Sequence, residues 1–257
     1  MKKSLEALAV FLAASVCGLP ANAQDWQAVT GLERRIVAAV AQWPSGVNLI
    51  ARCDGGIFDV MLPVVQKLDG IEIDVTYAFD DNEPATHTWN ASDNGEAIFA
   101  DLPTRFVRAL RASESLRLTI DDGSPPRQRY ELEVDGETSA LVDVMEACGK
   151  PLIDARDNFP VTPPKSVVWV ERPRPNPSDY PVRASSRGIN GRATVSCQVQ
   201  EDGRLDLCVV EGETPPRYGF GQAALKAAAH GRVTVPTDPQ GGWRPTLITF
   251  TVRFDMR

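Results

Sequence analysis

The cysteines are the residues whose number and spacing most directly predict chemistry. The 257-residue chain contains five, and four of them follow a predicted N-terminal leader: Cys53, Cys148, Cys197 and Cys208. An even number of cysteines in an exported protein predicts disulfides rather than free thiols. The spacing favours pairing Cys53 with Cys148 and Cys197 with Cys208, because each candidate domain then contains its own bridge.

Other residue types that bind metals or catalyse reactions form no motif. His87 and His230 are the only histidines, and no Cys-x-x-Cys pair is present, so we do not predict a metal site. Residues 80–83, Asp-Asp-Asn-Glu, could supply oxygen ligands to calcium, but they lack the spacing of an EF-hand loop and we favour a turn. We place His87 in a loop as a surface residue. We predict no enzymatic activity and no cofactor, with a pair of distant, converging carboxylates as the open catalytic alternative.

Residues 1–23 have the pattern of a secretory signal peptide. Lys2 and Lys3 precede an apolar run at 8–16, and residues 21–23 read Ala-Asn-Ala, a small-x-small cleavage site. We therefore expect a periplasmic protein with a cleaved leader. A lipoprotein leader ending at Cys17 is disfavoured because the residue before it is not small. If the leader is not cleaved, the alternative is a protein anchored in the inner membrane.

Charge is distributed unevenly along the chain, whose formal net charge is −7. Residues 25–150 contain 11 Lys and Arg against 22 Asp and Glu, whereas residues 178–257 contain 10 against 8. Neither part has the dense basic face of a nucleic-acid-binding protein, so we predict no nucleic-acid partner.

Residues 24–153 are predicted to form a mainly antiparallel β domain with helices at its ends. Apolar residues at helical spacing predict a first helix over 26–43. Further helical pieces are expected around 106–110 and 140–147. Short β-type runs, separated by Gly, Asp or Pro turns, predict strands at 49–53, 58–64, 71–79, 97–99, 116–120 and 130–134.

Several motifs in this first domain resemble a known family. They are Arg52-Cys53, Val75-Thr76-Tyr77-Ala78-Phe79-Asp80-Asp81, Trp89 with the Ser92–Phe99 segment, and Glu146-Ala147-Cys148-Gly149. They are similar to motifs of the periplasmic VasI-type proteins associated with type VI secretion. The resemblance covers about 100 residues, and it implies a bridge between Cys53 and Cys148.

Residues 154–177 are rich in proline and are predicted to link two domains. Six prolines lie in this segment, which favours an extended polyproline conformation. We expect a tether that does not fix the two domains relative to each other. The apolar patch Val167-Val168-Trp169-Val170 interrupts the segment and is a candidate for an additional strand.

Residues 178–257 contain the most ordered set of motifs. Asp179-Tyr180-Pro181-Val182-Arg183-Ala184 is followed by Gly188-Ile189-Asn190-Gly191, an alternating strand, Glu201-Asp202-Gly203-Arg204 and a second strand to Val210. A helix is predicted over 220–229 and a half-buried strand over 247–254. In order and spacing this segment resembles the TonB C-terminal domain family, which implies a small α-β-β-α-β domain. Overall we predict an α+β protein.

The register of the predicted hairpin decides whether Cys197 and Cys208 can pair. Strict alternation places Cys208 on the face opposite Cys197. The family pattern instead implies a bulge near Asp206 and Leu207, which turns both cysteines inward. We favour the bulged register and a cross-strand disulfide.

The family resemblance also implies how the protein acts. Members contact outer-membrane receptors by accepting an extended peptide at a strand edge, so we expect periplasmic or outer-membrane protein partners. The predicted partner-binding residues are Tyr180, Pro181, Arg183, Thr249, Thr251 and Arg253. A homodimer through the C-terminal domain is also compatible with such an edge.

One part of the family pattern is missing. Energy transducers of this family carry a Ser-x-x-x-His signature in an N-terminal membrane helix, and this chain has no histidine before His87. We therefore expect a TonB-family binding protein linked to outer-membrane transport rather than an energy transducer. The alternative is an accessory protein of the envelope or of a secretion system, which acts through its N-terminal domain and docks through the C-terminal one.

Overall fold

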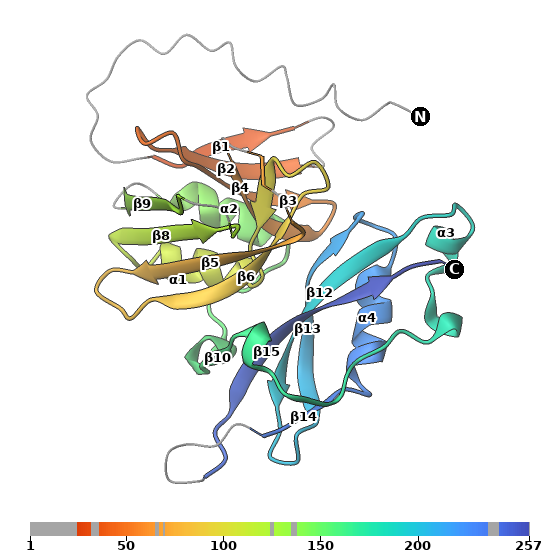
Figure 1. Ribbon diagram of the computed structural model, residues 1–257. Helices are drawn as coiled ribbons and strands as arrows, with labels where there is room; N and C mark the ends of the chain where they lie inside the picture. Colours follow the sequence, from red (N-terminus) through yellow and green to blue (C-terminus); the bar gives the residue numbers. More distant parts are fainter. Residues whose placement is uncertain are drawn as a thin grey trace.

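The computed structural model describes residues 25–31, 36–64, 67–68, 70–123, 126–134, 138–235 and 242–256. The predicted signal peptide, residues 1–23, lies outside the described residues, so its cleavage stays a prediction. The described chain is an α+β structure with two main sheets (Figure 1). Each sheet has its own core and its own disulfide. No helix within the described ranges is long and apolar enough to cross a membrane.

The first domain is built on one nine-stranded antiparallel sheet with the order β1-β2-β3-β4-β7-β6-β5-β8-β9. Helix α2 packs against β2 and β3, and helix α1 packs against β4. The elements are β1 (Gln27–Thr30), β2 (Ile36–Gln42), β3 (Asn48–Asp54), β4 (Ile57–Pro63), β5 (Glu72–Phe79), β6 (Ala85–Ala91), β7 (Ala97–Phe99), α1 (Pro103–Leu110), β8 (Ser115–Asp121), β9 (Gln128–Glu133) and α2 (Ser139–Ala147).

Alternating burial along the strands forms the core of this domain. In β3, for example, Leu49, Ala51 and Cys53 are buried and their neighbours are half-exposed. Cys53 bonds to Cys148 at the end of α2, with the two Cα atoms 5.4 Å apart. The predicted bridge is confirmed, and it ties the last helix to the sheet.

The predicted helix over 26–43 is wrong, because this part of the chain forms β1 and β2. Ala39, Ala41 and Trp43 are buried at a spacing of two, which is the period of a strand. Residues 36–41 are apolar at every position, so they fit a helical spacing as well as the period of a strand. The β-branched residues Ile36, Val37 and Val40 favour the strand.

Strand β6 was not predicted, and His87 was wrongly placed in a surface loop. His87, Trp89 and Ala91 are buried at alternating positions of β6, and Thr88 and Asn90 between them are less buried. The first buried position of the strand is a histidine rather than an aliphatic residue. Alternation of apolar residues therefore gave no signal here.

The proline-rich segment is not the extended tether that we expected. It contains three short 3-10 turns, η2 (Ala155–Asn158), η3 (Pro164–Ser166) and η4 (Pro177–Asp179), and the strands β10 (Val161–Thr162) and β11 (Trp169–Glu171). β10 pairs with the last strand of the chain, and β11 pairs with β14, so the segment is held against the C-terminal sheet. The extra strand predicted at 167–170 is confirmed as β11. The domain boundaries at 153/154 and 177/178 stay a proposal.

The C-terminal domain has the predicted α-β-β-α-β order. Its elements are α3 (Val182–Ser185), β12 (Gly191–Val199), β13 (Leu205–Thr214), α4 (Phe220–Ala228), β14 (Arg232–Val233) and β15 (Thr246–Phe254). The sheet has the order β10-β15-β12-β13. Helix α4 covers one face of this sheet, and the first domain lies at the other face (Figure 1).

The hairpin of β12 and β13 has the bulged register. Ser196 lies opposite Val209, whereas Gln198 lies opposite Asp206, so β13 contains one extra residue between these two pairs. This shift allows Cys208 to bond to Cys197, with a Cα separation of 4.1 Å. Both the predicted bulge and the predicted disulfide are confirmed.

Trp169 of β11 fills the corner between α4 and β15. It pairs with Val233 of β14 and contacts Phe250 of β15 edge to face, with the ring centroids 5.1 Å apart. An aromatic residue from the proline-rich segment therefore packs against the C-terminal sheet.

Candidate functional site

The last strand, β15, has a backbone edge that is only partly paired. On one side it pairs with β12 over its whole length, from Thr246 to Phe254. On the other side β10 pairs only with Leu247 and Ile248. Among the described residues, no strand pairs with that side of residues 249–254. Such an edge exposes backbone N–H and C=O groups to which a further strand can bond.

The predicted partner-binding side chains of β15 point toward the first domain. The Thr249 hydroxyl lies 3.3 Å from Oδ2 of Asp101, and Thr251 shares a hydrogen bond with Thr194 of β12 at 3.2 Å. Arg253 forms an ion pair of 3.2 Å with Glu72 of β5. Thr249 and Arg253 therefore contribute to the contact between the domains, and Thr251 is bonded within the C-terminal sheet. The backbone of this stretch is left for strand addition.

Tyr180, Pro181 and Arg183 lie together at another corner of the C-terminal domain. The Tyr180 hydroxyl donates to the backbone oxygen of Ile189 at 2.8 Å, and its ring packs against Phe220 and Phe254. Pro181 is the residue before α3. The exposed Arg183 lies over the ring of Tyr218 at 5.6 Å. The structure does not bring this corner into contact with Thr249, Thr251 or Arg253.

A groove of about 280 Å³ lies beside the free edge of β15. Its floor includes Thr249, Phe250 and Thr251 of β15 together with Thr194 of β12. One wall is the first domain, through Glu72, Thr88, Asn90 and Asp101, and the other wall is the proline-rich segment, through Pro164, Lys165, Trp169, Arg172 and Pro173. The groove therefore combines backbone from a free strand edge with side chains from both domains.

Asp101 connects this groove to the core of the first domain. Its carboxylate is 2% exposed, and its Oδ2 lies 3.0 Å from Nδ1 of His87. The His87 ring stacks on Tyr77, with the centroids 4.6 Å apart. Burial raises the pKa of the Tyr77 hydroxyl well above its ordinary value, and the nearby Asp101 carboxylate adds to this effect.

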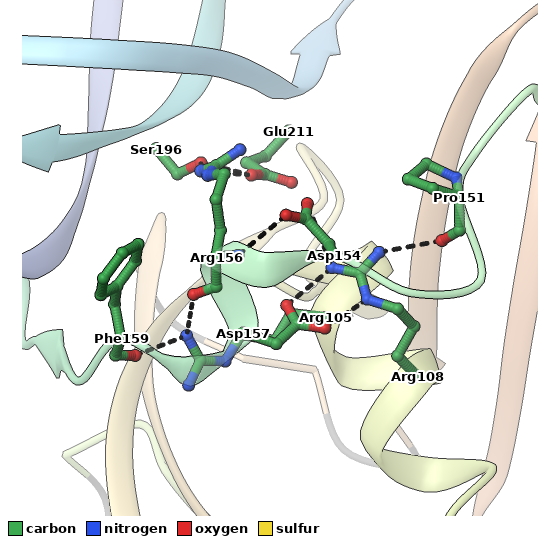
Figure 2. Close-up of polar contacts among 9 residues, drawn as sticks. All are labelled: Arg105, Arg108, Pro151, Asp154, Arg156, Asp157, Phe159, Ser196 and Glu211. Atoms are coloured by element: carbon green, nitrogen blue, oxygen red, sulfur yellow. Dashed lines mark hydrogen bonds and ion pairs between the residues drawn. The ribbon is translucent and has the colours of Figure 1, made fainter.

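A second polar contact joins the domains through Arg156 of η2 (Figure 2). Arg156 donates to the Ser196 hydroxyl, which in turn donates to the Glu211 carboxylate. Arg156 Nη2 itself lies 4.0 Å from Glu211. Burial raises the pKa of Glu211 to about 6, although the hydrogen bond from Ser196 and the charge of Arg156 oppose the shift.

Two arginines of α1 hold η2 in place, as Figure 2 shows. Arg108 forms a two-pronged contact with Asp157 and donates to the backbone oxygen of Pro151 at 3.2 Å. Arg105 donates to the backbone oxygen of Phe159 at 2.9 Å. The segment that leaves the first domain is therefore anchored to that domain before it reaches the C-terminal sheet.

Sequence reasoning missed the polar contacts between the domains. Ser196, Thr249 and Glu211 are the polar members of alternating strands, and such residues usually face water. Here their face is covered by the first domain. These contacts join residues far apart in the chain, such as Arg156 with Ser196 and Asp101 with Thr249, so no local pattern of the sequence indicated them.

The acidic residues 80–83 lie at the turn between β5 and β6, as predicted. Asp80 has a positive φ of 50°, and its carboxylate accepts the backbone N–H groups of Glu114 and Ser115 at 2.8 and 2.9 Å. These hydrogen bonds lower the pKa of Asp80. Within the described part of the chain, no group of three or more His, Cys, Asp or Glu side chains is arranged to hold a metal ion.

Comparison with known proteins agrees with the geometry of the C-terminal domain. Residues 176–256 match the family model of the Gram-negative bacterial TonB protein C-terminal. This TonB-like domain contains the free edge of β15, the floor of the groove, and the Tyr180 corner. The match covers the C-terminal domain only, and the first domain lies outside it.

Two solved structures are similar to parts of the chain. One is the solution NMR structure of the Pseudomonas aeruginosa TonB CTD, at 25% identity and a TM-score of 0.30, covering 39% of this chain and 96% of that one. The other is the crystal structure of invasion associated protein b from Bartonella henselae, at 16% identity and a TM-score of 0.36, covering 52% of this chain and 100% of that one. No curated protein matches the chain.

Proposed function

We propose that this protein is a non-enzymatic periplasmic binding protein of the TonB family, linked to outer-membrane transport. It takes up an extended segment of a partner protein at the free edge of β15. The observation that carries the proposal is the unpaired stretch Thr249–Phe254 beside a groove, within the segment that matches the TonB family model. An added strand gains affinity from main-chain hydrogen bonds and specificity from its alternating side chains.

The proposal assigns different roles to the predicted binding residues. Residues Thr249, Thr251 and Arg253 bind the partner through their backbone, because their side chains are engaged with the first domain and β12. Tyr180 and Pro181 shape the fold of the C-terminal domain. Arg183 is exposed and is the member of this corner that a partner can reach.

The periplasm is the proposed location. The two disulfides, Cys53–Cys148 and Cys197–Cys208, fit an oxidising compartment. The expected partners are periplasmic or outer-membrane proteins with an extended segment. A homodimer that forms through the C-terminal domain remains a prediction.

A second candidate function gives the first domain the leading role. In this candidate the protein is an accessory of the envelope or of a secretion system, and the TonB-like domain only docks it. The observation in its favour is that the first domain contributes a whole wall of the groove, through Glu72, Thr88, Asn90 and Asp101. A partner bound at β15 therefore touches both domains.

Photo-crosslinking in cells tests the two candidates. The photoreactive residue replaces Arg253 at the edge of β15 or, as the matched control, the exposed Arg129 on β9 of the first domain. Crosslinks to outer-membrane receptors from position 253 but not from 129 are the expected result. Crosslinks from position 253 to secretion or peptidoglycan components in place of outer-membrane receptors would favour the second candidate.

A further inference from the structure

The groove beside β15 contains a buried carboxylate oxygen that has no partner. Oδ2 of Asp101 contacts both His87 and the Thr249 hydroxyl. Oδ1 of the same carboxylate makes no hydrogen bond within the described part of the chain, although the side chain is only 2% exposed. An unsatisfied acceptor away from water costs free energy, so this oxygen favours a ligand that brings a donor.

The other charged groups that line the groove are already engaged. Glu72 pairs with Arg253, and Lys165 pairs with Asp74. Arg172 lies over the ring of Trp169 at 5.9 Å. These contacts lie at the exposed rim of the groove, where Glu72 and Lys165 are each paired with an opposite charge.

A strand added to β15 would direct side chains toward Asp101. Successive residues of a strand point to opposite faces of a sheet, and one of these faces is turned toward the first domain. Thr249 and Thr251 already point to that face, and the Thr249 hydroxyl reaches the Asp101 carboxylate at 3.3 Å. A long side chain on the neighbouring added strand lies on the same face and enters the groove between Asp101 and Lys165.

We propose that the groove selects an extended peptide with a lysine or arginine side chain, whose cationic head donates a hydrogen bond to Oδ1 of Asp101. This inference rests on the proposed addition of a strand to β15 and names the residue class that the site prefers. A cation suits the site because the acceptor is a buried carboxylate, and hydrogen bonds between charged partners are about twice as strong as neutral ones. The hydrocarbon part of the side chain packs beside Thr249 and Thr251.

Binding of two capped pentapeptides to the full exported chain tests the inference. The probes are acetyl-Thr-Val-Lys-Val-Thr-amide and the same peptide with norleucine in place of lysine, which has a similar length but cannot donate. Titrations followed by NMR give the affinity and show which β15 amides shift. We expect the lysine peptide to bind at least about tenfold more tightly than the norleucine peptide, as a charge-assisted hydrogen bond predicts.

Two variants locate the preference. Asp101→Asn removes the negative charge with little change in shape and is expected to abolish the tenfold preference for the lysine peptide over the norleucine peptide. Asp143→Asn makes the same charge change at an exposed position on α2 and is expected to keep the preference. If Asp101→Asn does not fold, the affinities of the two peptides for the unmodified protein still test the predicted preference for lysine.

The outcomes separate this inference from the proposed function. If both peptides shift the β15 amides with equal affinity, strand addition is supported and the selection by Asp101 is wrong. If neither peptide shifts these amides, the proposed function fails and the inference fails with it. A preference for lysine that persists in Asp101→Asn would also overturn the inference.

Discussion

Glu211 makes the stability of the protein depend on pH in a defined direction. Its carboxylate lies 8% exposed between the C-terminal sheet and η2, and burial raises its pKa from the ordinary 4.5 to about 6. A raised pKa means that the folded state holds the proton more tightly than the unfolded state does. The contribution of Glu211 to the free energy of unfolding is therefore greatest below pH 4.5, falls as the pH rises to about 6, and is constant above that. The total change is roughly 2 kcal/mol.

The variant Glu211→Gln isolates this contribution. Glutamine has the shape of the protonated acid and can still accept the hydrogen bond from Ser196, but it does not titrate. Relative to the original chain, the variant is expected to unfold with a similar free energy at pH 4 and to gain roughly 2 kcal/mol by pH 7.5. Urea unfolding followed by tryptophan fluorescence at the two pH values measures both differences.

The difference in the free energy of unfolding between the variant and the original chain is compared at the two pH values. The contributions of other carboxylates with shifted pKa values, such as Asp59 and Asp80, cancel in this comparison because they titrate in both chains. Glu131→Gln, at an exposed position on β9, is the matched control and is expected to show no such change. A gain for Glu211→Gln that is the same at pH 4 and pH 7.5 would refute the reasoning. A loss of stability that grows with pH would show instead that the ion pair with Arg156 outweighs the cost of burial.

Two further predictions concern the C-terminal domain. Replacing both Cys197 and Cys208 by serine removes a bridge with a sequence separation of 11. The chain-entropy relation predicts a loss of about 3 kcal/mol in the free energy of unfolding, measured by urea titration. An unchanged unfolding midpoint would contradict this prediction. Gly203 has a φ of +81°, and the Cβ that Gly203→Ala adds would lie 2.2 Å from the backbone oxygen of Val233. Thermal unfolding should therefore show a loss of about 2–4 kcal/mol in the free energy of unfolding. Gly212→Ala meets nothing within 4 Å and is expected to stay within about 0.5 kcal/mol of the original chain; equal effects of the two alanines would argue against the tight turn.

Local patterns predicted most of the strands and both longer helices of the fold. Short β-type runs between turns identified β3 and β4, and alternating residues identified β12. The helix over Phe220–Ala228 followed from its apolar face. The first two strands were mistaken for a helix, because the continuous apolar run at residues 36–41 fits both periods. β6 was missed, because its first buried residue is His87.

The candidate site could be predicted only in part, because it depends on the way the domains meet. The sequence pointed to the last strand, and β15 does have a free edge at Thr249–Phe254. It could not show that the side chains of Thr249 and Arg253 face the first domain, since alternation does not say what covers a polar face. The contact between Asp101 and Thr249 joins residues 148 positions apart, and no local pattern reports such a pair.

Hydrogen exchange at the edge of β15 tests the central claim most directly. In an antiparallel pair, alternate N–H groups of a strand point away from its neighbour, so every second amide within Thr249–Phe254 has no strand partner in the free protein. We predict that these amides exchange quickly when the protein is free and become protected when the lysine pentapeptide binds, while the amides bonded to β12 stay protected throughout. Unchanged exchange at these positions in the presence of bound peptide would contradict strand addition at β15.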